Sequence, residues 1–161
     1  MAIKVGDRLP ETKFHAMGPQ GPAVKTTDDV FKRKKVVLFA VPGAFTPTCN
    51  NNHLPSFLKN ADAIKAKGVD TIAVTGVNDV FVMEAWKKST GAGGRIEFLA
   101  DGNGDFAKAL GLSLDASGLG LGIRSKRYAM LVDDGVVKKL IVEEVPSKAE
   151  MSSAENLLKQ M

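Results

Sequence analysis

Residues 36–49 read VVLFAVPGAFTPTC, and this stretch decides the fold. Residues 36–40 are apolar at every position, which is typical of a strand buried on both faces of its sheet. Pro42, Gly43 and Pro47 then prevent the strand from continuing. Apolar side chains next recur at helical spacing, at Leu54, Phe57, Leu58, Ala61 and Ile64. We therefore predict a buried strand, a proline-rich loop and a helix, with Cys49 where the loop enters the helix.

The rest of the chain alternates strands and helices in the same way. Two short extended pieces flank the turn cluster GPQGP at 18–22, and Thr27-Asp28-Asp29 can cap a short helix that ends near Lys32. We expect Pro55 to kink the central helix and Gly68 to end it. Further strands are predicted over 70–77, 96–100, 128–132 and 136–142, a helix from Asp79 to the glycine loop 91–94, and a helix over 105–110.

The last part of the chain carries turn and cap signals. A glycine-rich loop is expected over 113–122, and Asp133-Asp134-Gly135 is typical of a hairpin turn. Ser152 with Glu155 forms a capping-box pattern that opens a terminal helix. This order predicts one α/β domain over residues 1–161, with a mixed central β-sheet flanked by helices on both faces.

Composition excludes several classes of protein. The chain has 161 residues, a net charge of +4 and one cysteine. One cysteine allows neither a disulfide within the chain nor a metal site built on two thiolates, and we expect no metal and no cofactor. The mild positive charge does not demand nucleic acid, and no apolar run approaches the ~18 residues that span a membrane. The start lacks the apolar core of a signal peptide, so we expect a cytoplasmic protein.

Cys49 is the strongest candidate for chemistry. A lone cysteine is usually a small buried hydrophobe, but Cys49 follows the carboxyl end of a central strand, where open α/β sheets bind ligands. An ordinary thiol is only a few per cent thiolate at pH 7. A helix N-terminus contributes about 0.3–2 kcal/mol, less than the roughly 2.7 kcal/mol that makes thiolate the main species. A cation is therefore needed as well.

Several neighbours could assist the thiol. The Thr46 hydroxyl can point at the sulfur or at a bound ligand, although Thr46 could equally be an ordinary N-cap. His53 lies four residues after Cys49 on the same helix face, so a Cys–His dyad is conceivable. We prefer an orienting or partly buried histidine.

The cation could come from the segment before the strand at 128. Arg124, Lys126 and Arg127 are the candidates, and strand alternation turns Lys126 away from Arg127. Solvated charges at a strand edge are the alternative interpretation. A second motif, GNGDFA at 102–107, matches G-x-G-x-x-A but lacks the acidic residue about 20 positions later, so it is a weak nucleotide signal.

The run 41–49, followed by His53-Leu54-Pro55 and Phe57, resembles the active site of a peroxiredoxin. The P-x-x-x-T-x-x-C core is formed by Pro42, Thr46 and Cys49. The full sequence of this run is similar to the type-5 subgroup, which includes the plant type II enzymes. The stretches VND at 77–79, FLAD at 98–101 and RSKRYA at 124–129 are similar to the same subgroup. The resemblance covers nearly the whole chain.

This resemblance implies a thioredoxin-like fold and thiol-dependent reduction of hydrogen peroxide and alkyl hydroperoxides. Cys49 matches the peroxidatic cysteine, Thr46 the hydroxyl that holds the peroxide, Pro42 the residue that shields the pocket, and Arg127 the catalytic arginine. Arg124 matches a second arginine that is common in the subgroup. The residues expected to line the substrate site are Gly43, Phe45, Thr48, His53 and Arg124.

One departure from the family concerns regeneration of the thiol. Many relatives carry a second, resolving cysteine, and this chain has none, so the resemblance implies a one-cysteine cycle. An external thiol must regenerate Cys49, with glutathione and glutaredoxin favoured over thioredoxin, and the subgroup implies a homodimer. Two other functions stay open: a Cys49–His53 hydrolase or acyl-transferase, and a non-catalytic binding module.

Overall fold

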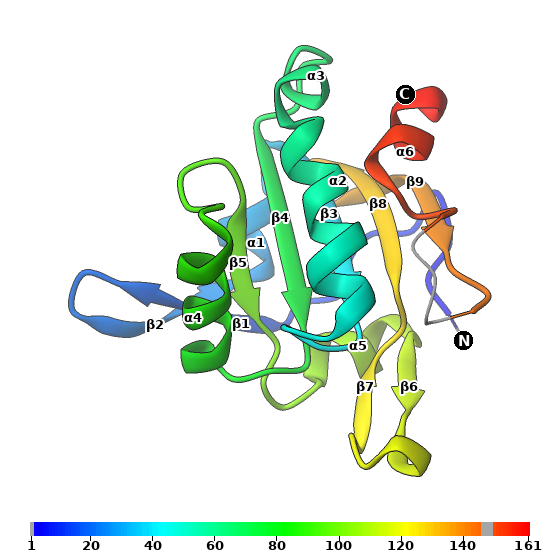
Figure 1. Ribbon diagram of the computed structural model, residues 1–161. Coiled ribbons are helices and arrows are strands. Elements are labelled where there is room, and N and C mark those ends of the chain that lie inside the picture. The colour runs from blue at the N-terminus through cyan, green and yellow to red at the C-terminus, as the bar shows by residue number, and fades with distance from the viewer. Residues whose placement is uncertain (1, 146–149) are drawn as a thin grey trace.

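The computed structural model describes residues 2–145 and 150–161, and its centre is a seven-stranded mixed sheet (Figure 1). The strands are β1 (Lys13–Gly18), β2 (Gly21–Thr26), β3 (Lys35–Val41), β4 (Thr71–Gly76), β5 (Glu97–Ala100), β8 (Tyr128–Asp133) and β9 (Val136–Val142). Their order is β2-β1-β5-β4-β3-β8-β9. The central strand β3 runs parallel to β4 and antiparallel to β8, which confirms the predicted mixed sheet.

Helices cover both faces of this sheet, as predicted. On one face lie α2 (Leu54–Lys59), α3 (Ala61–Lys65), α4 (Val80–Thr90) and α6 (Ala154–Gln160), and on the other lie α1 (Thr27–Phe31) and α5 (Asp105–Leu110). Successive side chains of β3 point to opposite faces, so Phe39 enters the first core and Leu38 the second. None of the described helices is long and apolar enough to cross a membrane.

Capping agrees with the prediction at α4 and differs by one residue at α1. The Asp79 side chain accepts a hydrogen bond from the Val82 N–H at 2.8 Å, as an N-cap does. At α1 the cap is Thr26 and not Thr27. The Thr26 and Asp29 side chains each accept from the other's backbone N–H, at 3.1 and 2.9 Å, which is a complete capping box.

The terminal helix also begins one residue later than the sequence pattern indicates. Its N-cap is Ser153, whose hydroxyl accepts from the Asn156 N–H at 3.2 Å, whereas we expected Ser152. Ser152 is fully buried and forms hydrogen bonds elsewhere. Burial of the first serine therefore decides which of two adjacent serines caps the helix.

The segment 113–122 is more ordered than the predicted loop. β6 (Ser113–Asp115) pairs antiparallel with β7 (Ile123–Ser125), and a 3₁₀ turn, η2 (Ser117–Leu119), lies between them. This two-stranded ribbon extends from the end of the sheet at which β3 and β4 finish (Figure 1). It places Arg124 beside the loops that follow those strands.

Candidate active site

The loop after β3 is held in shape by short polar contacts. The Ala44 N–H donates to the Asn78 side-chain oxygen at 2.9 Å, which ties this loop to the one that follows β4. The Thr46 hydroxyl donates to the Gly43 carbonyl at 2.7 Å. Phe45 adopts a φ of 65° and is 47% exposed, so its ring projects from the loop toward solvent.

Gly43 permits this loop to close tightly. A Cβ at position 43 would lie 3.0 Å from the Thr46 methyl carbon and 3.6 Å from Arg124 Nη1. Any side chain there would push Thr46 aside. Pro42 and Thr48, which we expected near the substrate, lie on the same loop and are half-buried.

The segment that carries Cys49 is a π-helix, η1 (Cys49–His53), directly before α2. Pro55 has no N–H and its ring would clash with the carbonyl four residues earlier in a regular α-helix. The Leu54 N–H bonds to the Cys49 carbonyl, which widens the turn at this point. The predicted kink at Pro55 therefore takes the form of a π-turn, and it buries both Cys49 and His53.

Cys49 and Arg127 meet although 78 residues separate them. Tyr128 pairs with Ala40 in the β3–β8 ladder, so Arg127 lies beside the end of β3, where the Cys49 loop begins. Arg127 Nη2 donates to Cys49 Sγ at 3.0 Å, and both side chains are buried. A guanidinium keeps its charge in proteins, and a buried charge is stable only with partners.

His53 contacts the arginine and not the sulfur. Arg127 Nη1 lies 3.0 Å from His53 Nδ1, and His53 Nε2 lies 3.0 Å from the Ser152 carbonyl. Arginine can only donate, so Nδ1 is the acceptor and Nε2 carries the proton. Burial and, second, the charge of Arg127 lower the pKa of His53 to about 3. The imidazole is therefore neutral at neutral pH, in line with the orienting role that we preferred.

Sequence reasoning missed the polar groups behind His53. The Glu143 carboxylate accepts from both the N–H and the hydroxyl of Ser152, each at 2.6 Å, and Glu143 is 6% exposed. The Glu143 N–H donates to the Arg127 carbonyl at 2.9 Å, which ties the residue after β9 to the residue before β8. The only sign of this cluster in the sequence is a glutamate directly after the strand predicted over 136–142, and a glutamate at a strand end is usually solvated.

Arg124 lies apart from these contacts. Its Nη1 donates to the Val77 carbonyl at 3.0 Å and its Nε to the Leu121 carbonyl at 2.9 Å. It thus joins the loop after β4 to the β6–β7 ribbon. The structure places Arg124 as a brace between two loops that flank the site.

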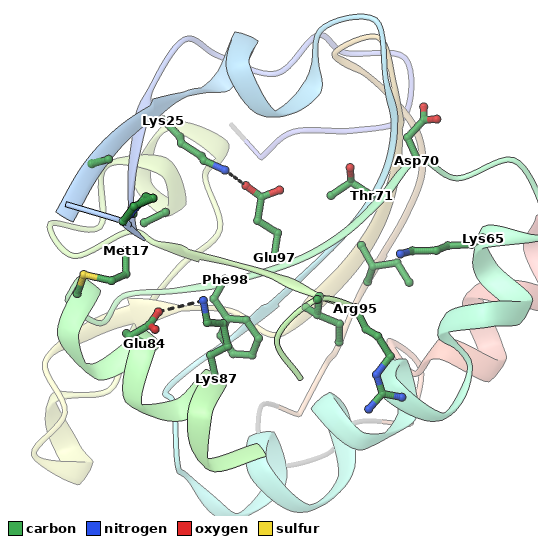
Figure 2. Close-up of a pocket in the computed structure, with 17 residues that line it drawn as sticks. Met17, Lys25, Lys65, Asp70, Thr71, Glu84, Lys87, Arg95, Glu97 and Phe98 are labelled. Carbon is green, nitrogen blue, oxygen red and sulfur yellow. Dashed lines mark hydrogen bonds and ion pairs between the residues drawn. The ribbon is translucent and has the colours of Figure 1, made fainter. Parts of the chain in front are cut away.

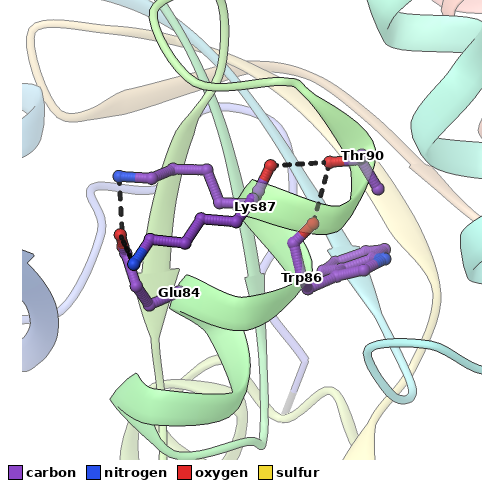
Figure 3. A network of polar contacts seen from close by, with 5 residues as sticks. Glu84, Trp86, Lys87 and Thr90 are labelled. Atoms are coloured by element: carbon purple, nitrogen blue, oxygen red, sulfur yellow. Dashed lines mark hydrogen bonds and ion pairs between the residues drawn. The ribbon is translucent and has the colours of Figure 1, made fainter.

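Helix α4 supports the segment around Cys49 from the side. Figure 3 shows Trp86 pointing out of α4, and its indole N–H donates to the Asn50 side chain at 2.9 Å. The Thr90 hydroxyl closes the last turn by donating to the Trp86 carbonyl at 2.9 Å, and Glu84 pairs with Lys87 at 3.1 Å. The indole is therefore a fixed neighbour of the residue that follows Cys49.

A groove of about 650 Å³ lies elsewhere, where β1 and β5 diverge after one ladder pair (Figure 2). Two ion pairs join charged side chains that line it, Lys25 with Glu97 and Lys87 with Glu84. None of the residues predicted for the site lines it. This groove is therefore separate from the residues predicted for the site.

Comparison with known proteins identifies relatives that match almost the whole of this chain. Residues 4–158 match the family model described as Redoxin. The chain is 48% identical to chloroplastic Peroxiredoxin-2E of Arabidopsis thaliana, over 99% of this chain and 70% of that protein. It is 46% identical to Peroxiredoxin-2C of Oryza sativa, over 99% of this chain and 98% of that protein. The structure of reduced Prx3 of Vibrio vulnificus with H₂O₂ is 49% identical and superposes with a TM-score of 0.92, over 98% of each chain.

Proposed function

This chain belongs to the peroxiredoxins of the redoxin family and is a thiol-dependent peroxidase with a thioredoxin-like fold, and we propose that Cys49 is where it reduces hydrogen peroxide and alkyl hydroperoxides. The observation that carries this assignment is the 3.0 Å contact from Arg127 Nη2 to Cys49 Sγ. A buried guanidinium favours a negative partner, so the thiolate is the form of Cys49 that this site stabilises.

The reaction is a displacement at oxygen. The Cys49 thiolate attacks one peroxide oxygen, an S–O bond forms, and the O–O bond breaks. Hydroxide or an alkoxide leaves with the electron pair and takes a proton from solvent. Cys49 becomes a sulfenic acid and the peroxide is reduced to water or an alcohol.

Three groups besides Arg127 act on the peroxide oxygens. The backbone N–H groups of Thr48 and Cys49 donate to the oxygens, most strongly while the O–O bond breaks, and the Thr46 hydroxyl, whose proton is donated to the Gly43 carbonyl, accepts from the peroxide O–H. Pro42, which is half-buried on the same loop, limits the access of water. Arg127 stabilises the charge that spreads along the S–O–O axis through Nη2, which contacts Cys49 Sγ, while Nη1 is held by His53.

A second thiol completes the cycle. The chain holds a single cysteine, so the sulfenic acid is resolved by an external thiol. Glutathione forms a mixed disulfide that glutathione or glutaredoxin clears, and thioredoxin is the competing reductant. With excess peroxide and no reductant, Cys49 proceeds to sulfinic acid. Turnover with glutathione, with and without glutaredoxin, measured against thioredoxin, identifies the reductant.

The protein acts as a homodimer. Exposed apolar side chains lie on the loop after β3, at the start of α4 and on the β6–β7 ribbon, and we call this set the apolar rim: Phe45, Phe81, Leu119 and Ile123, which are 47%, 65%, 80% and 56% exposed. Large apolar side chains left exposed in this way favour association. Sedimentation should show Phe81→Asp to be monomeric, whereas Val24→Asp, at a 52% exposed position on β2, stays dimeric. A dimeric Phe81→Asp protein would contradict this interface.

The location is a reducing compartment, and the cytoplasm is the simplest one. The single free cysteine supports this, since no disulfide within the chain depends on an oxidising environment. The relative from Arabidopsis is described as chloroplastic. Fractionation of the source cell distinguishes the two locations.

Trapping the intermediate tests the assignment of Cys49. The protein is treated with an alkyl hydroperoxide in the presence of a sulfenate-specific dione and then weighed. Rapid addition of one dione at Cys49 supports the proposal. Slow or scattered addition would contradict it. Acylation by an activated ester that requires His53 would instead indicate the hydrolase, which the His53–Arg127 contact disfavours.

A further inference from the structure

Behind Cys49 a continuous chain of buried polar groups runs to the C-terminal helix. Each contact is short: Sγ to Arg127 at 3.0 Å, Arg127 to His53 at 3.0 Å, and His53 to the Ser152 carbonyl at 3.0 Å. Glu143 then holds Ser152 through two bonds of 2.6 Å. All five side chains are buried, the most exposed being Glu143 at 6%.

We propose that His53, Ser152 and Glu143 are positioning residues, which aim the Arg127 guanidinium at the Cys49 sulfur and link reactivity to the docking of α6. This inference rests on the proposed function. It goes beyond that function by assigning a role to Glu143 and Ser152, which the peroxide does not reach.

Each contact in this chain restricts the orientation of the next group. The carboxylate holds the backbone at Ser152, and the Ser152 carbonyl fixes which nitrogen of His53 carries the proton. The unprotonated Nδ1 then receives one arm of the guanidinium. With that arm held, the other arm points at Sγ. The aromatic rings of Phe39 and Phe57 pack against the His53 ring and restrict its rotation, with centroids 5.0 and 5.6 Å away.

The same chain joins the site to the C-terminal segment. Ser153, the residue after Ser152, caps α6, and Leu157 of α6 packs in the core that also holds Cys49. The Ala154 N–H donates to the Ser56 hydroxyl at 3.3 Å, which ties the start of α6 to α2. Displacement of α6 would therefore move the Ser152 carbonyl and release His53.

Two substitutions of His53 test its two ring nitrogens separately. His53→Asn places an amide oxygen where Nδ1 accepts from Arg127, and His53→Gln places an amide nitrogen where Nε2 donates to Ser152. We expect the rate constant of Cys49 with H₂O₂ to fall about 10–100-fold in His53→Gln and clearly less in His53→Asn, since misplacement by about 1 Å can cost 10²-fold. His15→Gln, at the only other histidine, which is exposed, is the matched control.

Two further variants test the outer part of the chain. Glu143→Ala should slow the peroxide reaction about 3–10-fold. Glu144→Ala, at the exposed neighbouring position, is the control and should keep the wild-type rate. Ser153→Ala removes the cap of α6, so it should lower the melting temperature and, because α6 then docks less firmly, slow the same reaction by less than Glu143→Ala does. If Glu143→Ala does not fold, Ser152→Ala takes its place, because it removes the hydroxyl bond to Glu143.

The readouts are the stopped-flow rate with H₂O₂, the thiolate absorbance near 240 nm at pH 7, and thermal melting. Folded His53→Gln with the wild-type rate and absorbance would overturn the positioning role. Folded Glu143→Ala that matches Glu144→Ala would overturn the link to α6. Failure of the wild-type protein itself to react with H₂O₂ would refute the proposed function instead, so the two failures are distinguishable.

Discussion

Lowering the pH should destabilise this fold through His53. The pKa of this buried imidazole is about 3 in the folded protein, against 6.5 for an ordinary histidine. Below pH 6.5 His53 is protonated in the unfolded chain but stays neutral in the folded chain, so the unfolded state binds more protons. Stability is therefore complete above pH 6.5 and falls as the pH drops toward 3.

The size of the effect follows from the two values. Each pH unit between them costs about 1.4 kcal/mol, so the His53 contribution between pH 6.5 and 4.5 is about 3 kcal/mol. That is a large share of the roughly 5–15 kcal/mol that stabilises a typical domain. Burial of the ring is the larger cause and the Arg127 charge the smaller one.

Urea denaturation at pH 7.0 and 4.5, followed by Trp86 fluorescence, measures this loss. The comparison is between wild type and His53→Asn, because the difference between their losses cancels carboxylates that also titrate, such as Asp29 and Asp115, whose pKa values are lowered by hydrogen bonds. Wild type should lose about 3 kcal/mol more than His53→Asn. His15→Gln should behave as wild type does. Equal losses in wild type and His53→Asn would refute the claim that the fold keeps His53 neutral.

Three substitutions test other parts of the account. Arg127→Lys should slow the reaction of Cys49 with H₂O₂ by on the order of 10²-fold in stopped flow, because the single ammonium nitrogen cannot occupy the positions of both Nη1, beside His53, and Nη2, beside Sγ; a wild-type rate would remove Arg127 from the mechanism. Gly43→Ala places a Cβ 3.0 Å from the Thr46 methyl carbon and should slow the same step, whereas Gly118→Ala, with nothing within 4 Å, should not; equal rates would mean that the position of Thr46 does not matter. Gly76→Ala places a Cβ 3.0 Å from the Val41 carbonyl oxygen on the adjacent strand, so urea denaturation should show a loss of about 1–3 kcal/mol, and unchanged stability would contradict the tight packing of β3 on β4.

Local patterns predicted much of the architecture. The apolar run 36–40 lies within the central strand β3, Asp79 caps α4, and the turn at 133–135 joins β8 to β9. These features depend on near neighbours in the chain. The motif residues Cys49 and Arg127 were paired through the family resemblance, and the β3–β8 register is the physical reason that they meet.

The features that sequence reasoning missed depend on distant partners. The choice of Ser153 over Ser152 as the cap of α6 follows from the carboxylate of Glu143, nine residues earlier. The pattern at Ser152 and Glu155 looks equally good without that contact. The π-turn at Cys49 follows from Pro55 together with the burial of His53 between Arg127 and Ser152. Spacing alone placed His53 beside Cys49 but did not show that it faces the arginine.

The central claim is that Arg127 and the loop after β3 make Cys49 a thiolate that attacks peroxides. The most direct measurement is the second-order rate constant of the reduced protein with H₂O₂ at pH 7, from Trp86 fluorescence, with free cysteine in the same buffer as reference. We predict a rate at least about 10³-fold above free cysteine, as expected where positioned donors stabilise developing charge. A rate within about tenfold of free cysteine, for protein whose mass shows an intact thiol, would contradict the claim.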